Sequence, residues 1–342
     1  MTRYIIRRLI QALPIMFGIT VLSYLLMTAA PGGPTAALAL DPRLSPQQRQ
    51  AAAARLGVND PWPVQYLRWL LGDDWMWVDV DGDGTLDEPG TRKGVLRGDF
   101  GNSYTYRQPA LQVVGERVLA TLELGLSALL IGLLLGVPIG VISAVKRGSW
   151  FDNFARVMAV VFNAVPIFWL GLILILIFGS MLGVLPMGGR CPTTLLGGCP
   201  PVPERLNYLI LPTIVLATGG IAGYSRYLRA STLEVLGEDY VRTAKAKGLR
   251  DRQVYMTHAA RNALIPLATF LGPAITGLLG GAAVTETIFS WPGLGRLAVS
   301  SVLQQDYPVI MTVVIISAIA TILGYIISDI LYAAIDPRIR FS

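Results

Sequence analysis

Six long apolar segments, almost free of charge, follow one another along the chain with polar segments between them. At about 1.5 Å of rise per residue, each is long enough to cross a hydrocarbon core of roughly 30 Å as a helix. The pattern predicts an all-α integral membrane protein with six transmembrane helices. The predicted spans are 10–30, 118–145, 157–185, 206–225, 263–285 and 308–334, and only Glu123 and Asp329 place a charge inside them.

Basic residues indicate how these helices cross the membrane. With an even number of spans both termini lie on one side. Lys and Arg are more than twice as frequent per residue on one side as on the other. The richer side comprises 1–9, 146–156, 226–262 and 335–342, and the poorer side comprises 31–117, 186–205 and 286–307. Because positive residues gather on the cytoplasmic side, we expect both termini there. A long extracytoplasmic loop then follows the first helix, and a cytoplasmic loop joins the fourth helix to the fifth.

Composition agrees with this class and excludes others. Hydrophobic residues make up 53% of the chain and charged residues 15%, against about a quarter in soluble domains. So apolar a chain is not intrinsically disordered. The net charge of +6 comes from the cytoplasmic segments, so we expect no nucleic-acid partner. The first apolar run is longer than the 7–15 residues or so of a signal core, which favours a retained helix over a cleaved signal.

The loop 226–262 carries an amphipathic pattern that Gly248 interrupts. A short helix of this kind lies on anionic lipid or docks into a groove of a cytosolic partner. Gly248 either allows close approach to that partner or merely ends the helix. The apolar positions of the stripe are Leu233, Leu236, Tyr240, Val241 and Ala244.

Several strings in order along the chain carry a family resemblance. They are RRL at 7–9, PVQY at 63–66, GDFGNS at 98–103, YVRTAKAKGL at 240–249, RNALIP at 261–266, ETIFSWPGLG at 286–295, DYP at 306–308 and DPR at 336–338. Together they resemble the permeases of ABC importers, and more narrowly the oligopeptide, dipeptide and nickel class of binding-protein-dependent transport system inner membrane components. The resemblance covers nearly the whole chain outside 73–93. It departs from the general importer pattern at Arg242, where that pattern has Glu.

The resemblance implies the permease subunit of an ATP-driven importer that moves di- or oligopeptides across the cytoplasmic (inner) membrane by alternating access. Such a subunit pairs with a second homologous permease chain, binds two cytosolic ABC ATPase subunits and receives cargo from an extracytoplasmic solute-binding protein. It also implies coupling to the ATPase through Tyr240, Arg242, Ala244 and Gly248, with Ala244 and Gly248 on one helical face. No G-x-x-x-x-G-K-[ST] loop occurs, so we expect no enzyme activity here and ATP with Mg²⁺ on partner subunits.

The same expectations divide the chain into four parts. An N-terminal cytoplasmic end with the first helix (1–30) precedes an extracytoplasmic loop (31–117) that contains an acidic insert (73–93). A core permease domain with five helices (118–334) and a cytoplasmic tail (335–342) follow.

A stand-alone secondary transporter or channel is the alternative function. Proton-coupled carriers keep ionisable residues near the bilayer centre, whereas Glu123 lies near the outer end of its span and Asp329 near the inner end. We expect both to be interfacial or packed against polar neighbours. Asn163 and Thr276 are pathway candidates that equally suit helix packing. A receptor or scaffold with a calcium-responsive outer loop would leave the cytoplasmic loop unexplained.

The acidic insert fits a calcium-binding loop. Gly84 supplies the sharp turn, and the hard Ca²⁺ ion prefers such a group of oxygens. Gly90 stands where the bidentate Glu of such loops is expected, and Glu88 is the possible substitute. A structural Ca²⁺ site and a plain acidic turn therefore both remain open. The candidate ligands are Asp79, Asp81, Asp83, Thr85, Asp87 and Glu88.

The two cysteines, Cys191 and Cys199, both lie in the second outer loop. An oxidising exterior favours a disulfide between them over two free thiols. A zinc site would need more ligands, and the only histidine, His258, is expected on the opposite side of the membrane.

Overall fold

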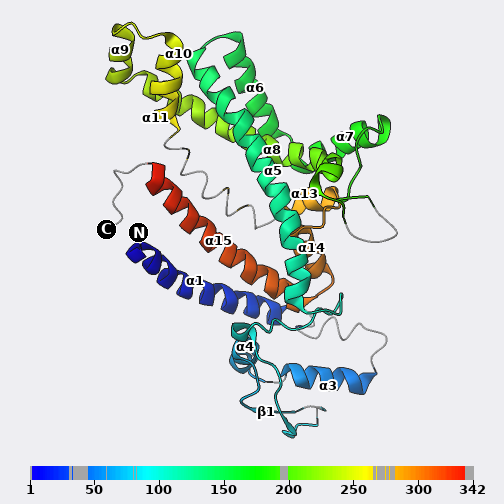
Figure 1. Ribbon diagram of the computed structural model, residues 1–342. Coiled ribbons are helices and arrows are strands. Elements are labelled where there is room, and N and C mark those ends of the chain that lie inside the picture. Colours follow the sequence, from blue (N-terminus) through cyan, green and yellow to red (C-terminus); the bar gives the residue numbers. More distant parts are fainter. Residues whose placement is uncertain are drawn as a thin grey trace. The chain divides into compact units, whose positions relative to one another are not determined.

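The structure is a computed structural model that describes residues 2–30, 33, 45–58, 60–79, 81, 83–192, 199–264, 267, 274, 277 and 282–335. Most of these residues are helical (Figure 1). They fall into two compact units. We call Leu119–Arg296 with Ala320–Ser342 the core unit, and Thr2–Val118 with Leu297–Ile319 the N-terminal unit.

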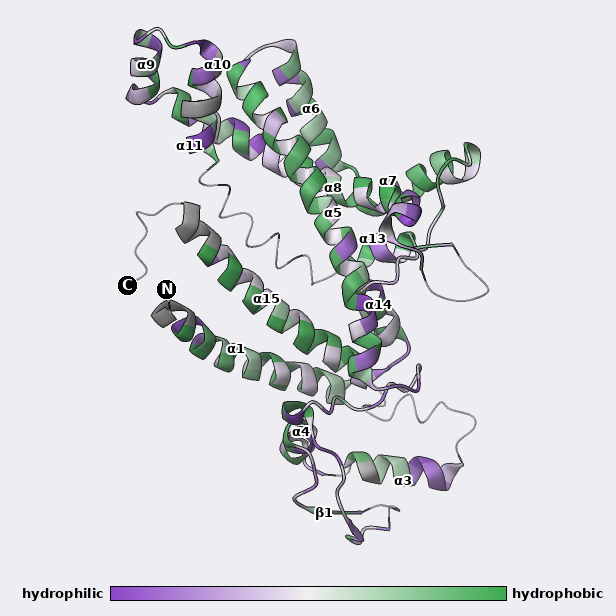
Figure 2. Cartoon of the chain, viewed as in Figure 1, coloured by the Kyte–Doolittle hydropathy of each residue, from purple (hydrophilic) through white to green (hydrophobic). Residues whose placement is uncertain are grey.

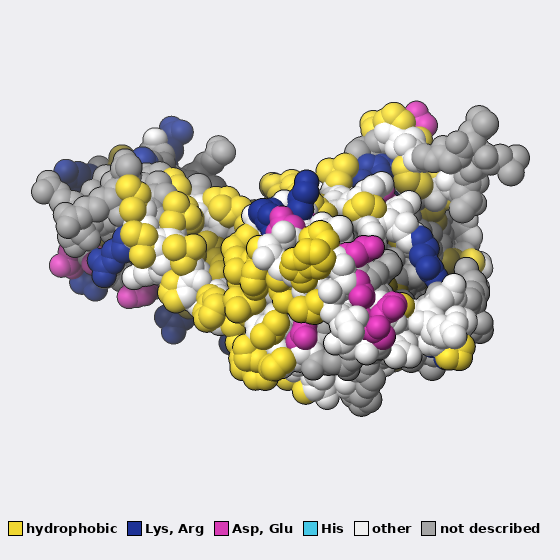
Figure 3. All heavy atoms as spheres, turned by 90° about the horizontal axis from the view of Figure 1, so that it is seen from below, with side chains coloured by type: hydrophobic (Ala, Val, Ile, Leu, Met, Phe, Trp, Pro, Cys, Tyr) yellow, Lys and Arg dark blue, Asp and Glu magenta, His cyan; other side chains and the backbone are white. Residues whose placement is uncertain are grey.

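Four helices of the described residues are long and apolar enough to cross a membrane. The predicted spans 10–30, 118–145, 206–225 and 308–334 fall almost entirely within them. Hydrophobic residues dominate these helices along their length (Figure 2), and broad hydrophobic areas are visible on the surface (Figure 3), as expected of lipid-facing helices. The four are α1 (Thr2–Ala29), α5 (Ala110–Val145), α8 (Val202–Leu236) and α15 (Tyr307–Ile335).

The third predicted span, 157–185, is not one straight helix. The chain forms α6 (Trp150–Ala164), then α7 (Ile167–Leu174), then the π-helical η3 (Ile175–Met181), and it bends by 98° between α6 and the rest (Figure 1). The bend is at Val165, which has an extended ψ of 122°. Pro166 follows, and a proline disfavours helical geometry in the residue before it.

Most of the fifth predicted span, 263–285, lies outside the described residues, and so do Thr276, the tail 336–342 and the loop segment 34–44. Two short helices, α13 (Ala283–Ile288) and α14 (Leu294–Leu303), follow that span.

In the N-terminal unit the described residues between α1 and α5 fold into short elements, one of which packs against α1. The helix α3 (Pro46–Leu56) begins with a capping box between Ser45 and Gln48 and precedes α4 (Trp62–Leu71). Tyr66 of α4 packs with Tyr24 and Met311, and its hydroxyl lies 2.9 Å from Thr20 Oγ1 of α1. The remaining elements are β1 (Trp77–Val78), its antiparallel partner β2 (Glu88–Pro89), and η2 (Val95–Arg97).

A buried carboxylate also ties residues 103–105 to the segment before α15. Asp306 is fully buried and accepts hydrogen bonds from the Ser103 hydroxyl and from the amides of Tyr104 and Thr105, at 3.2 and 3.1 Å. Burial and the charge of Asp306 raise the pKa of Tyr104 to about 12. Two strings of the family resemblance, at 98–103 and 306–308, therefore meet in one contact.

In the core unit α5 and α8 pack closely. A Cβ atom built on Gly140 of α5 would lie 2.6 Å from the Ser225 carbonyl oxygen of α8, so a larger residue at this position forces the helices apart. The helix α6 is joined to α8 by an ion pair between Asp152 and Arg229. These contacts join α5 and α6 to α8, and the chain continues from the end of α8 at Leu236 into the loop that carries the coupling candidates.

Candidate functional site

The amphipathic stripe predicted in the loop 226–262 belongs to two helices. α8 continues to Leu236, and α9 (Asp239–Ala246) begins after a break at which Glu238 has extended geometry (φ −71°, ψ 146°). α10 (Asp251–Gln253), the π-helical η4 (Val254–Ala260) and α11 (Arg261–Ala263) complete the loop. The prediction of a single stripe from Leu233 to Ala244 is therefore wrong.

The apolar face of α9 is turned into this chain. Val241 and Ala244 are buried and pack with Val254, beside Val235 and Tyr255. The expectation that Ala244 offers a small side chain to a partner groove is corrected by this contact. Its small size instead allows α9 to lie close against η4.

Gly248 ends α9. Its φ of +73° is a left-handed conformation, which glycine adopts without the steric cost paid by other residues. Its amide donates to the Lys245 carbonyl at 3.0 Å, and a Cβ built there would meet nothing within 4 Å. The geometry thus accounts for Gly248 as a helix terminator, the simpler of the two interpretations of the sequence.

The exposed face of α9 carries the remaining coupling candidates. Tyr240 is 42% exposed, and its hydroxyl accepts a hydrogen bond of 2.9 Å from Asn262 Nδ2. Arg242 is exposed and lies 3.4 Å from Asp239. The structure therefore brings Tyr240 and Arg242, but not Ala244, to a surface on which another protein can bind.

A cavity of about 250 Å³ lies in the core unit. Most of the lining residues that the structure describes are small or apolar, and Glu286 is the one acidic residue among them. Sequence reasoning found no ligand pocket in the spans, because the lining combines residues from distant parts of the chain. It is formed by Thr121, Leu124, Gly125, Ala128 and Leu129 of α5, by Leu216, Gly220 and Tyr224 of α8, and by Ala274, Gly277, Ala282 and Glu286.

Glu286 is fully buried and anchors the turn after α13. Its Oε2 accepts from the Arg296 amide at 2.8 Å, and its Oε1 accepts from the Thr121 hydroxyl at 3.0 Å. The Leu294 amide donates to that hydroxyl at 2.7 Å, so the hydroxyl proton points to the carboxylate. A Cβ built on Gly293 would lie 2.4 Å from Glu286 Cδ. The string ETIFSWPGLG thus folds closely around the carboxylate of Glu286. In the sequence, only the family resemblance pointed to this residue.

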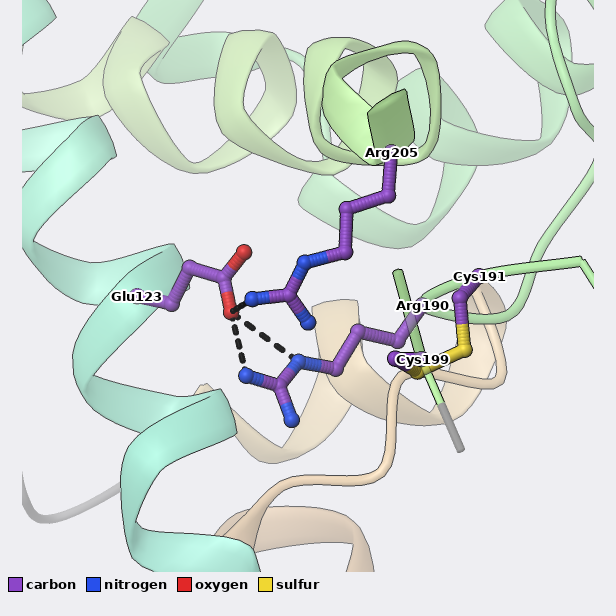
Figure 4. The surroundings of a disulfide bond; sticks show 5 residues. All are labelled: Glu123, Arg190, Cys191, Cys199 and Arg205. Carbon is purple, nitrogen blue, oxygen red and sulfur yellow. Dashed lines mark hydrogen bonds and ion pairs between the residues drawn. A yellow bond between two sulfur atoms is a disulfide. The ribbon is translucent and has the colours of Figure 1, made fainter. Parts of the chain in front are cut away.

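The cysteine-bearing segment before α8 approaches α5 through a largely buried ion-pair cluster (Figure 4). The guanidinium groups of Arg190 and Arg205 converge on the same Glu123 oxygen, with Nε of Arg190 at 2.9 Å and a terminal nitrogen of Arg205 at 3.0 Å. A disulfide joins Cys191 to Cys199, directly after Arg190. Glu123 is therefore packed against charged neighbours, and the disulfide constrains the loop that supplies one of them.

The acidic insert brings four carboxylates together. One oxygen from each of Asp79, Asp81, Asp83 and Asp87 lies within 4.8 Å of the others. Hydrogen bonds from Thr85 lower the pKa of Asp83. These residues have the ligand type and the proximity that Ca²⁺ requires, and Ca²⁺ binding stays a prediction.

Glu88 does not belong to this group. It lies in β2 opposite Val78, outside the cluster of four carboxylates. Gly90 has no room for the missing Glu, because a Cβ there would lie 2.2 Å from the Asp73 carbonyl oxygen. Of the acidic candidates, the four aspartates are therefore the ones that come together, and the Thr85 carbonyl stays a predicted ligand beside them.

Comparison with known proteins gives full-length relatives. The chain is 40% identical to the oligopeptide transport system permease protein AppB of Bacillus subtilis, with all of both chains covered. It is 37% identical to the dipeptide transport system permease protein DppB of Escherichia coli, with 99% of each covered. A chain of the inward-facing methionine ABC transporter MetNI has a similar fold, with a TM-score of 0.52 at 19% identity over 66% of this chain and 97% of the other.

Two family profiles cover nearly all of the sequence. Residues 1–125 match the N-terminal part of the binding-protein-dependent transport system membrane components, and residues 136–341 match the inner membrane component of these systems. Together with the apolar helices, these matches indicate a multi-pass inner membrane protein. The chain belongs to the family of binding-protein-dependent transport system inner membrane components.

Proposed function

We propose that this chain is a membrane-spanning permease subunit of an ATP-driven importer for di- or oligopeptides. The observation that carries the proposal is the similarity over the full length to permeases named for oligopeptide and dipeptide transport. Binding-protein-dependent systems receive their cargo from a separate solute-binding protein, and the chain has no P-loop of its own. Transport energy then comes from ATP and Mg²⁺ bound on partner subunits.

The proposal includes a topology and a set of partners. Six transmembrane helices place both termini in the cytoplasm, as the distribution of Lys and Arg favours. The chain pairs with a second homologous permease and with two cytosolic ATPase subunits. Tyr240 and Arg242, on the exposed face of α9, contact the ATPase, and closure of the ATPases shifts the permease pair between two states.

A first experiment tests the partners. The chain is purified from its native membranes in gentle detergent, and the copurifying proteins are identified by mass spectrometry. A second six-span permease and two P-loop ATPases support the importer. A chain that comes alone, or only with copies of itself, contradicts it and favours a stand-alone secondary transporter or channel.

A second experiment tests the coupling surface. Arg242→Glu reverses a charge on the exposed face of α9 and leaves the buried face untouched, so we expect ATP-driven uptake to fall by about tenfold or more while the permease pair still forms. Glu234→Lys, an exposed charge reversal at the end of α8, is the matched control. Equal uptake by both variants would remove α9 from the coupling surface.

A further inference from the structure

Glu286 is a buried carboxylate without a cationic partner among the described residues. Its hydrogen bonds come from the Thr121 hydroxyl and from the amides of Arg296 and Ala282, at 3.0, 2.8 and 3.4 Å. The guanidinium of Arg296 is directed elsewhere and donates to the Ser290 carbonyl. Dipolar donors stabilise a carboxylate by hydrogen bonding, but they do not supply an opposite charge.

The Glu286 carboxylate is tightly packed on one side and borders the cavity on the other. On one side the backbone of the turn lies so close that Cβ atoms on Gly293 and Gly295 would reach 2.4 and 3.0 Å from its atoms. On the other side Glu286 and Thr121, which share a hydrogen bond, both line the cavity. Ionisable residues that line an interior cavity of a membrane protein and have no ion-pair partner are candidates for contact with a charged ligand.

The size and lining of the cavity narrow the class of ligand. Pockets for drug-sized molecules measure about 300–1,000 Å³, so a cavity of about 250 Å³ takes one end of a peptide rather than a whole oligopeptide. Leu124, Ala128, Leu216 and Gly220 contribute apolar surface with few hydrogen-bonding groups. Such a lining accepts side chains of different kinds, as a carrier of varied peptides requires.

We infer that the cavity between α5, α8 and α13 binds the amino-terminal end of the cargo peptide, with Glu286 as the counter-charge of its α-ammonium group. This inference rests on the proposed peptide function. Every unmodified peptide carries this ammonium group, so one carboxylate recognises the whole class without selecting a sequence. The apolar lining contacts the first side chain.

Adjacent glycines of α8 provide a matched pair of variants. Gly220 lines the cavity, whereas Gly219 is exposed and has nothing within 4 Å of an added Cβ. Gly220→Leu fills the cavity and leaves Glu286 in place, and Gly219→Leu adds the same bulk outside. Because the ring of Tyr224 must shift to admit a side chain at Gly220, Ala128→Leu on α5 serves as a second filling variant.

The test measures binding of radiolabelled Ala-Ala to the assembled transporter in nanodiscs, without the binding protein. We expect saturable binding that weakens by about tenfold or more in Gly220→Leu and Ala128→Leu, and by less than about twofold in Gly219→Leu. Alaninamide, which keeps the ammonium group, should compete, and N-acetylalanine, which lacks it, should not. Glu286→Gln should remove the preference for alaninamide.

Three results would overturn the inference. The filling variants could bind Ala-Ala as well as Gly219→Leu does, N-acetylalanine could compete as well as alaninamide, or potassium chloride could compete as well as alaninamide at equal ionic strength. The last result would identify a site for cations in general. Uptake with the binding protein and ATP separates the two proposals, because a wild-type transporter that imports no peptide refutes the proposed function itself.

Discussion

The substitution Asp152→Asn should destabilise the core unit by about 3 kcal/mol, because it leaves a largely buried guanidinium without its counter-ion. Asp152 is fully buried at the start of α6. It accepts from Arg229 of α8, with Nε at 2.6 Å and a terminal nitrogen at 2.9 Å, and from the Gly148 amide at 2.9 Å. This fork is the best-formed link between α6 and α8.

The magnitude follows from the geometry. Each hydrogen bond to a charged group contributes about 1.5–3 kcal/mol, and breaking a buried pair costs about 3–5 kcal/mol in all. The Arg229 side chain is 21% exposed, so water partly replaces the lost carboxylate and the lower end of that range applies. Arg229→Met should cost a similar amount, since it leaves the buried carboxylate of Asp152 with the Gly148 amide and the exposed, more distant Arg156 in place of the fork.

The structure supplies a matched control on the same carboxylate. Arg156 lies 3.7 Å from Asp152 in an i,i+4 pair, but its side chain is 53% exposed. Exposed pairs of this kind contribute about 0.5 kcal/mol or less. Arg156→Met should therefore be almost neutral, although it removes a positive charge from the same acid.

The assay is unfolding of the purified permease by SDS in mixed micelles, followed by tryptophan fluorescence. The set comprises both single variants, their double variant and Arg156→Met. The double variant should cost clearly less than the sum of the single variants, because it leaves no unpaired buried charge. Full additivity, or an equal loss in Arg156→Met and Arg229→Met, would refute the reasoning.

Three further predictions concern separate features of the chain. Purified protein should bind Ca²⁺ in isothermal titration calorimetry, and Asp81→Asn should weaken that binding because it removes one of the four clustered carboxylates. An unchanged affinity in Asp81→Asn would exclude the loop as the site. Replacing Cys191 and Cys199 by Ser should lower the free energy of unfolding by about 2–3 kcal/mol, as expected for so short a ring, whereas an unchanged SDS midpoint would show that the ring adds nothing. Trp291→Phe should cost about 1–3 kcal/mol, since the indole Nε1 donates to the buried Ala120 carbonyl at 2.8 Å, and a neutral result in the same SDS assay would contradict that bond.

Features that depend only on residues close together in the sequence could be predicted from it. Four spans were found because the length and hydrophobicity of a segment already decide whether it can cross a membrane. Spacing within the loop 79–87 was enough to gather four carboxylates, because ligands so close in the chain need only one turn to meet. Where a local effect was overlooked, as at Val165 before Pro166, the predicted helix failed.

In the loop 226–262 the spacing of apolar residues predicts an apolar face but not what covers it. The stripe correctly marks Val241 and Ala244 as an apolar face, but an apolar face can pack on a partner or on its own chain. In the structure this face packs on its own chain, since both side chains are buried against Val254 of η4. No spacing within α9 carries that information, because the covering residue lies beyond the end of the helix.

By itself the sequence determined the membrane class, most of the spans, the cysteine-bearing loop and the family, all of which are properties of segments or of whole-chain similarity. Only the tertiary structure joined Glu286 to Thr121, 165 positions away, and Asp152 to Arg229 across two helices. It alone showed a cavity whose lining is shared by α5 and α8. The physical reason is that hydrophobic pattern fixes which residues leave water, whereas the partner of each buried charge depends on how the helices pack.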